Sequence, residues 1–424
     1  MAPLKVSDQV KARVGEGPTD TLLPKASKTF GIVVLVLQLV LLVAFALLAA
    51  APVAADSNAP APASPQLYNY YIGVTLMMFV GFGYLMTFLR WYGLGAVGLT
   101  MFVTTLGVEV SLLVEPLLGG TDVTIGILAL LRANFAVAAF LISFGGLIGK
   151  VNPTQLVVLV VLESVFYCFN KQILMTAWLG IADVGGTIVI HMFGAYFGLA
   201  IALVLGAPKS TPLEKSSVTS DIFSLIGTTF LWLYWPSFVA GEVAPGSAEA
   251  ELALTQTVLS LCASTVVTFG LSPLLSGGKI RPVDVQNATL AGGVAIGAVA
   301  NLPLGPAGAL TIGAVAGAVS TVGFCRIQEF LAAKVGLHDT CGIHNLHGMP
   351  SLVGGLASVV CGLVITSPAV GSPLNQLAGI VVTLMAAVLS GGLTGVAMKA
   401  LADAAEMADD SAYWDVADDF TKDV

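Results

Sequence analysis

The stretch Asp183-Val-Gly-Gly-Thr-Ile-Val-Ile-His191 has a counterpart later in the chain, Asp339-Thr-Cys-Gly-Ile-His-Asn-Leu-His347. Each stretch places a carboxylate eight residues before an imidazole, a separation of about 12 Å along an α-helix. Both stretches lie in or beside long apolar runs, so the role of these Asp and His residues has to be inferred from the apolar sequence around them.

The surrounding composition is that of a membrane protein. Of 424 residues, 56% are hydrophobic and 10% are charged, whereas soluble domains carry about a quarter charged residues. This excludes an ordinary soluble enzyme. The net charge of −8 implies no nucleic-acid partner. The five cysteines include no CxxC pair, and we expect neither a metal site nor a cofactor.

Apolar runs long enough to cross a bilayer, about 20 residues, predict an all-α polytopic membrane protein with about 12 transmembrane helices. The runs lie near residues 30–50, 71–89, 93–115, 124–148, 154–178, 183–206, 221–241, 251–275, 287–303, 306–330, 340–367 and 375–401. The first run ends in Leu47-Leu48-Ala49-Ala50-Ala51, which also has the form of a signal-peptidase site. The run and the basic region before it are longer than in signal peptides, which favours a retained helix.

The distribution of Lys and Arg predicts the orientation of these helices. With both termini in the cytoplasm, all but two of the 17 basic residues fall in cytoplasmic segments. The two exceptions are Arg132 and Lys171, which lie within predicted spans. We therefore expect a cytoplasmic tail at 1–29, a transmembrane channel domain at 30–401 and an acidic, solvated cytoplasmic tail at 402–424.

In this orientation the sixth and eleventh runs cross in opposite directions, so both histidines fall near mid-membrane. This arrangement predicts inverted five-helix repeats, about 71–206 and 221–367, with a site at the bilayer midplane. Two facing neutral imidazoles leave one lone pair and one N–H along a pore, which suits a small neutral molecule. Asp183 and Asp339 are interpreted as helix caps, with proton carriage as the alternative. His338 is expected to be solvated in an inner loop.

Several longer motifs carry a family resemblance. They are Met78-Phe-Val-Gly-Phe-Gly-Tyr-Leu-Met-Thr-Phe-Leu, His191-Met-Phe-Gly-Ala-Tyr-Phe-Gly-Leu, Ile226-Gly-Thr-Thr-Phe-Leu-Trp-Leu-Tyr-Trp-Pro-Ser-Phe238, Gln286-Asn-Ala-Thr-Leu-Ala-Gly-Gly-Val-Ala, and residues 339–350. In these motifs the chain resembles the Rhesus (Rh) branch of the ammonium transporter (Amt/Mep/Rh) superfamily. The resemblance implies the ammonium transporter fold, with an eleven-helix core and an extra N-terminal helix. It also implies a homotrimer with one pore per subunit.

The resemblance assigns roles to individual residues. The pore histidines of the family correspond to His191 and His347, and His344 is a neighbouring motif position. The two phenylalanines that gate the outer mouth correspond to Phe135 and Phe238. The family's carboxylate ahead of the first pore histidine corresponds to Asp183.

Two departures from the family pattern lie near the expected outer vestibule. Where relatives commonly have Asn-Ala-Asp-Phe, this chain has Arg132-Ala-Asn134-Phe, and where they often have Asn-Glu it has Asn-Lys171. One hypothesis is that Glu109 pairs with one of these cations and leaves the pore unchanged. The other is a vestibule that attracts ammonium less, because a like charge at 4 Å costs about 4 kcal/mol at an effective dielectric of about 20.

The leading functional hypothesis is an ammonia/ammonium channel or transporter in the plasma membrane rather than an enzyme. A carbon dioxide channel of the same fold is an alternative that the missing vestibule acids favour. A non-transporting ammonium sensor or scaffold is a third possibility, against which the presence of both histidines argues.

Overall fold

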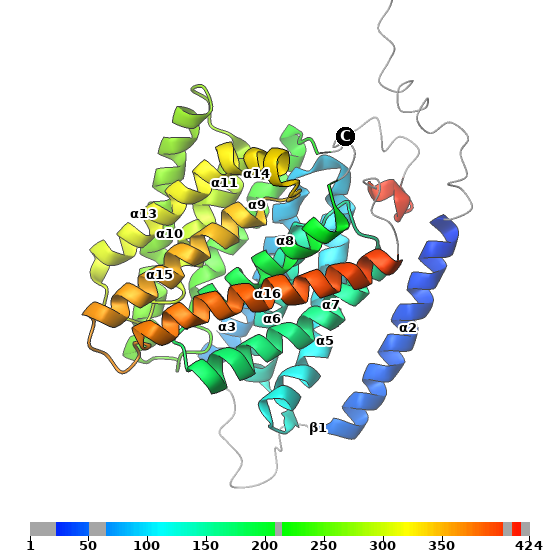
Figure 1. The fold of residues 1–424 in the computed structure, drawn as a ribbon, viewed down its shortest axis with the longest axis horizontal. Helices are drawn as coiled ribbons and strands as arrows, with labels where there is room; N and C mark the ends of the chain where they lie inside the picture. The colour runs from blue at the N-terminus through cyan, green and yellow to red at the C-terminus, as the bar shows by residue number, and fades with distance from the viewer. Residues whose placement is uncertain (1–22, 51–64, 208–213, 402–408, 417–424) are drawn as a thin grey trace, which may run out of the picture.

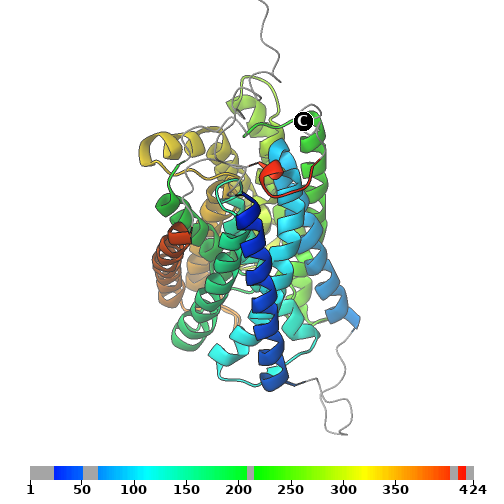
Figure 2. The same cartoon turned by 90° about the vertical axis from the view of Figure 1, so that its right-hand side faces the viewer.

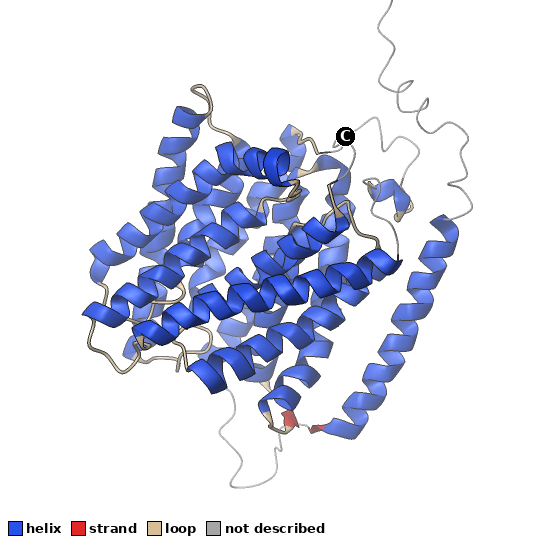
Figure 3. Cartoon of the chain, in the orientation of Figure 1, coloured by secondary structure: helices blue, strands red, loops and turns tan. Residues whose placement is uncertain are grey.

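The structure is a computed structural model that describes residues 23–50, 65–207, 214–401 and 409–416. These residues are almost entirely helical (Figure 3). Eleven helical segments within them are long and apolar enough to cross a membrane. The segments are Lys28–Leu48, Pro65–Phe88, Gly95–Gly119, Ile127–Gly145, Pro153–Leu179, Thr187–Leu205, Val218–Val239, Ala248–Leu275, Gly305–Val335, His344–Val364 and Pro373–Leu401. The chain is an integral membrane protein.

The helices run side by side in one bundle (Figure 1). The α-helices are α2 (Leu23–Leu48), α3 (Pro65–Leu76), α4 (Gly83–Leu85), α5 (Thr100–Gly119), α6 (Ile127–Gly145), α7 (Pro153–Cys168), α8 (Phe193–Leu205), α9 (Val218–Val239), α10 (Ala248–Leu275), α11 (Pro282–Asn287), α12 (Ala291–Ile296), α13 (Gly305–Val322), α14 (Gln328–Val335), α15 (Met349–Val364) and α16 (Pro373–Leu401). Between them lie π- or 3₁₀-helical segments: η2 (Met77–Phe82), η3 (Met86–Phe88), η4 (Arg90–Tyr92), η5 (Gly95–Leu99), η6 (Phe169–Leu179), η7 (Thr187–Met192), η8 (Ala288–Leu290), η9 (Gly323–Ile327), η10 (His344–Gly348) and η11 (Asp410–Ala412).

The ninth predicted span, 287–303, differs from its neighbours. The contiguous run of α11, η8 and α12 stops at Ile296, and the chain then turns through residues 297–302. Residues 286–300 are all buried. The apolar run at this place therefore reflects the interior of the bundle rather than a full-length helix facing lipid.

The first helix, α2, stands at the edge of the bundle (Figures 1 and 2). Its Phe30 contacts Phe102 of α5, with ring centroids 5.3 Å apart. At its other end β1 (Ala49–Ala50) pairs in parallel with β2 (Val123–Thr124). Most of its remaining apolar side chains are exposed, as expected of a helix surrounded by lipid.

Glycines allow the closest helix contacts. A Cβ at Gly354 of α15 would overlap the Ala295 carbonyl oxygen of α12, and one at Gly313 of α13 would overlap the Ser260 carbonyl oxygen of α10. Small residues at such contacts let backbones approach in a medium that gives no hydrophobic driving force between helices.

Part of the C-terminal tail packs against the bundle instead of being solvated. Asp410 is 4% exposed, and its carboxylate accepts hydrogen bonds from the amides of Leu94 and Gly95, at 2.6 and 2.7 Å. Trp414 packs on Gly98, where a Cβ would overlap its ring. The expectation of a wholly solvated tail was therefore wrong for residues 409–416, because their side chains bind the start of the helix at Gly95. Residues 402–408 and 417–424, and most of the predicted N-terminal tail, lie outside the described residues.

Candidate pore and vestibule

Both candidate pore histidines lie in short π-helical segments. His191 belongs to η7, which follows Gly186 with its positive φ of 70°, and His347 belongs to η10. A π-helical turn adds one residue to the α-helical repeat and re-aims the side chains beside it, which is why such turns are frequent at functional sites.

A carboxylate caps the start of each of these segments. Asp183 accepts hydrogen bonds from the amides of Ile188 and Val189, both at 2.8 Å. Asp339 accepts them from the amides of residues 342, 343 and 344. The contacts agree with the capping interpretation. The two caps differ in one respect: Asp183 Oδ1 is buried and has no hydrogen-bond partner among the described residues.

The two imidazoles face each other in the interior. The Nδ1 atoms of His191 and His347 lie 3.2 Å apart, and the rings are 11° from parallel with centroids 5.2 Å apart. Both residues are almost fully buried. Only one proton fits between the two Nδ1 atoms. One ring therefore presents a bare Nε2 acceptor and the other an Nε2–H donor.

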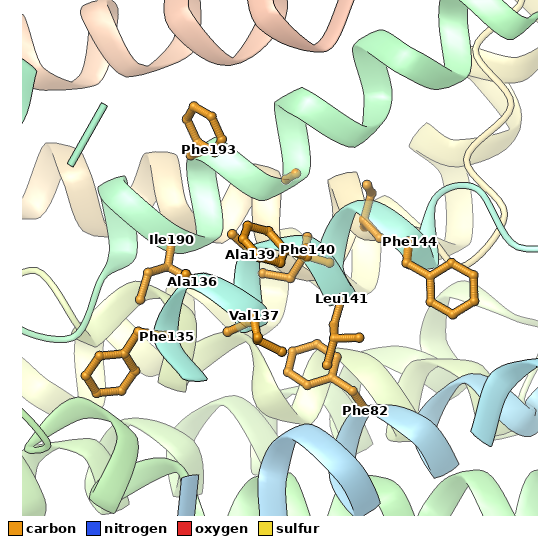
Figure 4. Close-up of a cluster of buried hydrophobic side chains, with 14 of the residues drawn as sticks. Phe82, Phe135, Ala136, Val137, Ala139, Phe140, Leu141, Phe144, Ile190 and Phe193 are labelled. Atoms are coloured by element: carbon orange, nitrogen blue, oxygen red, sulfur yellow. The ribbon is translucent and has the colours of Figure 1, made fainter. Parts of the chain in front are cut away.

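Aromatic rings surround this pair. Trp235 stacks on His191 with centroids 5.6 Å apart, and Phe82 stacks on His347 at 6.2 Å. Phe135 and Phe238 contact edge to face at 4.9 Å, and Phe238 also contacts His191. Figure 4 shows Phe135 at one end of the α6 segment that it draws and Phe82 alongside this segment. The histidine pair is thus enclosed by apolar rings that exclude water.

Cavities lie on both sides of these rings. A cavity of about 280 Å³ is lined by Phe135, Phe238, Asp183, Lys171 and Glu242, among others; we call it the vestibule. A much smaller space of about 20 Å³ is lined mainly by apolar side chains, together with Asn287 and His347. The phenylalanine pair and the histidine pair therefore separate an open, polar cavity from a narrow apolar one.

The vestibule cations have partners other than the predicted one. Arg132 Nε lies 2.8 Å from Glu242 Oε1, and Lys171 Nζ lies 3.2 Å from Glu115 Oε1 and 3.4 Å from Glu242 Oε1. Glu109 pairs with neither cation, and its Oε2 is buried without a hydrogen-bond partner in the described part of the chain. The predicted pairing with Glu109 was wrong, because Glu115 lies nearer the end of the same helix, beside the cation.

Sequence reasoning missed Glu242. It lies one helical turn beyond Phe238 and is an isolated acid at the end of an apolar run, a signal that could have placed it beside the gate. Burial raises the pKa of Glu242, but the Lys171 ammonium and the Arg132 guanidinium lower that pKa by more, to below its usual value. The side chain is therefore a carboxylate at neutral pH.

Asn134 and His344 are neighbours in sequence of the candidate pore residues, but their side chains contact other residues. Asn134 is buried and donates to the Thr75 hydroxyl and the Leu130 carbonyl oxygen, both at 3.2 Å, and it does not line the vestibule. His344 contacts Tyr196 edge to face at 5.9 Å. The structure therefore joins His191, His347, Phe135 and Phe238 in one place and leaves these two residues outside it.

His338 is buried rather than solvated. Its Nε2 lies 2.6 Å from Glu214 Oε1, and its carbonyl oxygen accepts a hydrogen bond of 2.5 Å from Lys150 Nζ. Burial lowers the pKa of Lys150 to about 8. The expectation of solvation was wrong because Glu214 and Lys150, from two other connections, cover this loop.

Comparison with known proteins agrees with this architecture. A family model described as the Ammonium Transporter Family matches residues 32–410. The protein "Ammonium transporter Rh type A" of Canis lupus familiaris is 43% identical over 303 residues, covering 70% of this chain and 72% of that protein. "Ammonium transporter Rh type B" of Homo sapiens is 41% identical over 358 residues, covering 78% of each chain.

Solved structures give the same result. The structure of Nitrosomonas europaea Rh50 has a TM-score of 0.76 at 37% identity, covering 84% of this chain and 94% of that one. Mep2 of Saccharomyces cerevisiae has a TM-score of 0.66 at 19% identity, covering 82% and 87%, and shares the fold. The chain therefore belongs to the ammonium transporter family and, within it, to the Rh branch.

Proposed function

We propose that this protein is an Rh-type channel that conducts ammonia through a hydrophobic pore lined by the paired imidazoles of His191 and His347. The observation that carries this proposal is the 3.2 Å contact between the two buried Nδ1 atoms. The contact leaves one hydrogen-bond donor and one acceptor in an otherwise aromatic enclosure. Ammonia both donates and accepts hydrogen bonds, so it can replace part of its lost hydration at this pair.

The ammonium ion is excluded from the same space. The rings of Phe135, Phe238, Trp235 and Phe82 remove water, and an unpaired cation without water costs far more than a neutral solute. Ammonium therefore gives its proton to water in the vestibule before its nitrogen passes the phenylalanine pair, and Asp183 and Glu242 stand on the vestibule side of this barrier.

The vestibule charges support ammonia over carbon dioxide as the cargo. Asn134 and Lys171 stand where the family pattern has acids, and Arg132 adds a second cation, but Glu115 and Glu242 pair with both cations. The vestibule thus carries no excess of positive charge from these four residues, and these charges do not disfavour ammonium.

The Rh-branch membership supports a homotrimer in the plasma membrane, built on inverted repeats with the vestibule outside and both termini in the cytoplasm. The buried Lys150 and the basic residues Lys279 and Arg281 lie in connections, Arg326 lies in η9, and none of the four lines the vestibule. Lysine and arginine are enriched on the cytoplasmic side of membrane proteins, which agrees with this orientation.

Transport by purified protein in liposomes tests the proposal. Ammonium and carbon dioxide gradients are applied separately while internal pH and membrane current are recorded. We expect protein-dependent permeation of ammonia and a permeability to carbon dioxide equal to that of protein-free liposomes. Protein-dependent permeation of carbon dioxide alone would assign the pore to that gas, and permeation of neither would favour the sensor or scaffold.

A further inference from the structure

We propose that the side chain of Lys171 competes with the transported cation for a binding site. Its ammonium group binds the Glu242 carboxylate, to which an incoming ammonium ion would bind in the vestibule. This inference rests on the function proposed above and extends it by assigning the residues that determine the apparent affinity for ammonium.

The first support is the position of the Lys171 head group. Lys171 comes from η6, Glu115 from α5 and Glu242 from the turn after α9. The Lys171 Nζ atom lies 3.2 Å from one carboxylate and 3.4 Å from the other. Lys171 and Glu242 both line the vestibule, whose inner end is formed by Phe135 and Phe238. The vestibule lining thus includes an alkylammonium held between two carboxylates.

The second support is chemical identity. The lysine head group is an ammonium with three N–H donors, and the substrate cation is an ammonium with four. A carboxylate pair that holds one of them in this cavity offers the same charge and the same acceptors to the other. The four-carbon stem lets the lysine head group swing away, and the Lys171 side chain is 13% exposed, so the cavity reaches it.

The third support is a set of acceptors that the lysine does not use. The Tyr167 hydroxyl and Asp183 Oδ1 are buried without hydrogen-bond partners among the described residues, and both residues line the vestibule. Two residues of the vestibule lining thus keep oxygen atoms that Lys171 does not use.

The net charge at the vestibule mouth predicts how removal of Lys171 changes the binding of ammonium. Arg132 and Lys171 offset Glu115 and Glu242. Replacing Lys171 by an uncharged side chain of similar length leaves one net negative charge at the mouth and frees one side of Glu242. Both changes raise the local concentration of ammonium.

The test compares Lys171→Met, Lys171→Arg and Lys279→Met in liposomes at pH 6, where nearly all substrate is ammonium. We expect Lys171→Met to lower the half-saturating ammonium concentration roughly three- to tenfold at low salt, the effect of one charge at several ångströms in partly screened surroundings. Lys171→Arg keeps the charge and is expected to stay within twofold of wild type, a bound set by the same electrostatic argument.

Lys279→Met is the matched control, because it removes the same charge from an exposed loop after α10. It should leave the half-saturating concentration unchanged. In the Glu242→Gln background the effect of Lys171→Met on half-saturation should shrink, because the carboxylate for which the two ammonium groups compete is absent. An effect of net charge alone would persist in this background.

Three results would overturn the competition: a well-assembled, conducting Lys171→Met with wild-type half-saturation, an equal shift in Lys279→Met, or an undiminished effect in the Glu242→Gln background. If Lys171→Met does not assemble, Lys171→Gln replaces it in the same comparison. Failure of the proposed function is separate, because it appears as wild-type liposomes without ammonia permeation above protein-free controls.

Discussion

The Nδ1 atom of His191 lies 3.2 Å from the Nδ1 atom of His347, with the two rings only 11° from parallel. The contact requires one ring to donate and the other to accept, because two N–H groups would repel each other and two lone pairs would leave both buried nitrogen atoms without a proton. The pair is therefore stable with one proton between the two Nδ1 atoms. A second proton on these atoms would break the hydrogen bond.

Removing either ring should reduce ammonia conduction. For His191→Ala and for His347→Ala we expect a loss of at least about tenfold, equivalent to about 1.4 kcal/mol, because ammonia would lose a hydrogen-bonding partner inside the apolar enclosure. Stopped-flow measurement of ammonia permeation at equal protein density checks this. Wild-type flux and selectivity in both variants would contradict the role of the pair.

His344→Asn serves as the matched control for these variants. His344 lies three residues before His347 in the same π-helical segment and contacts Tyr196 rather than His191. We expect conduction to change by less than about threefold, or about 0.65 kcal/mol. A loss as large as that of His347→Ala would move the pore position to His344 and would refute the assignment from the Asp-to-His spacing.

Two glycines in transmembrane helices should respond oppositely to alanine. A methyl group at Gly354 would overlap the Ala295 carbonyl oxygen, whereas one at Gly392 would have no atom within 4 Å. We expect Gly354→Ala to destabilise the protein by about 1–3 kcal/mol through overpacking. Gly392→Ala should be neutral or stabilising, because alanine has the higher helix propensity.

Thermal unfolding in detergent, followed by size-exclusion chromatography, measures both changes. Equal melting temperatures for Gly354→Ala and Gly392→Ala would contradict the close approach of α15 to α12.

Docking of the C-terminal segment should strengthen as the pH falls. Burial and the neighbouring Asp409 raise the pKa of Asp410 to about 6, against an opposing effect of the Leu94 and Gly95 amides. The docked state thus binds more protons than the free tail between the ordinary pKa of about 3.9 and about 6. By linkage, the docked state gains stability as the pH falls through this window and loses it as the pH rises.

Hydrogen exchange of residues 409–416, corrected for the intrinsic pH dependence, should therefore show more protection at pH 5 than at pH 7. Asp410→Asn should remove most of this difference. Protection that increased from pH 5 to pH 7 would mean that the ionised carboxylate is the better cap.

The local features of this protein could be read from its sequence because they depend on residues close together in the chain. A helix that crosses a bilayer must be apolar over about 20 consecutive residues, so the runs at 154–178 and 375–401 correspond closely to the spans Pro153–Leu179 and Pro373–Leu401. The eight-residue spacing of Asp183 and His191 likewise fixed the carboxylate at the start of the helical segment that carries the imidazole.

Only the tertiary structure decided which charges meet. Lys171 pairs with Glu115 and Glu242, which are 56 and 71 residues away in the sequence, and Asp410 caps a helix start 315 residues away. No local pattern distinguishes Glu115 from Glu109, because both lie on the same helix and only its packing against η6 brings one of them to the cation. Packing against α10, α13 and α15 likewise buried residues 286–300, where an apolar run has the same composition whether its surroundings are lipid or other helices.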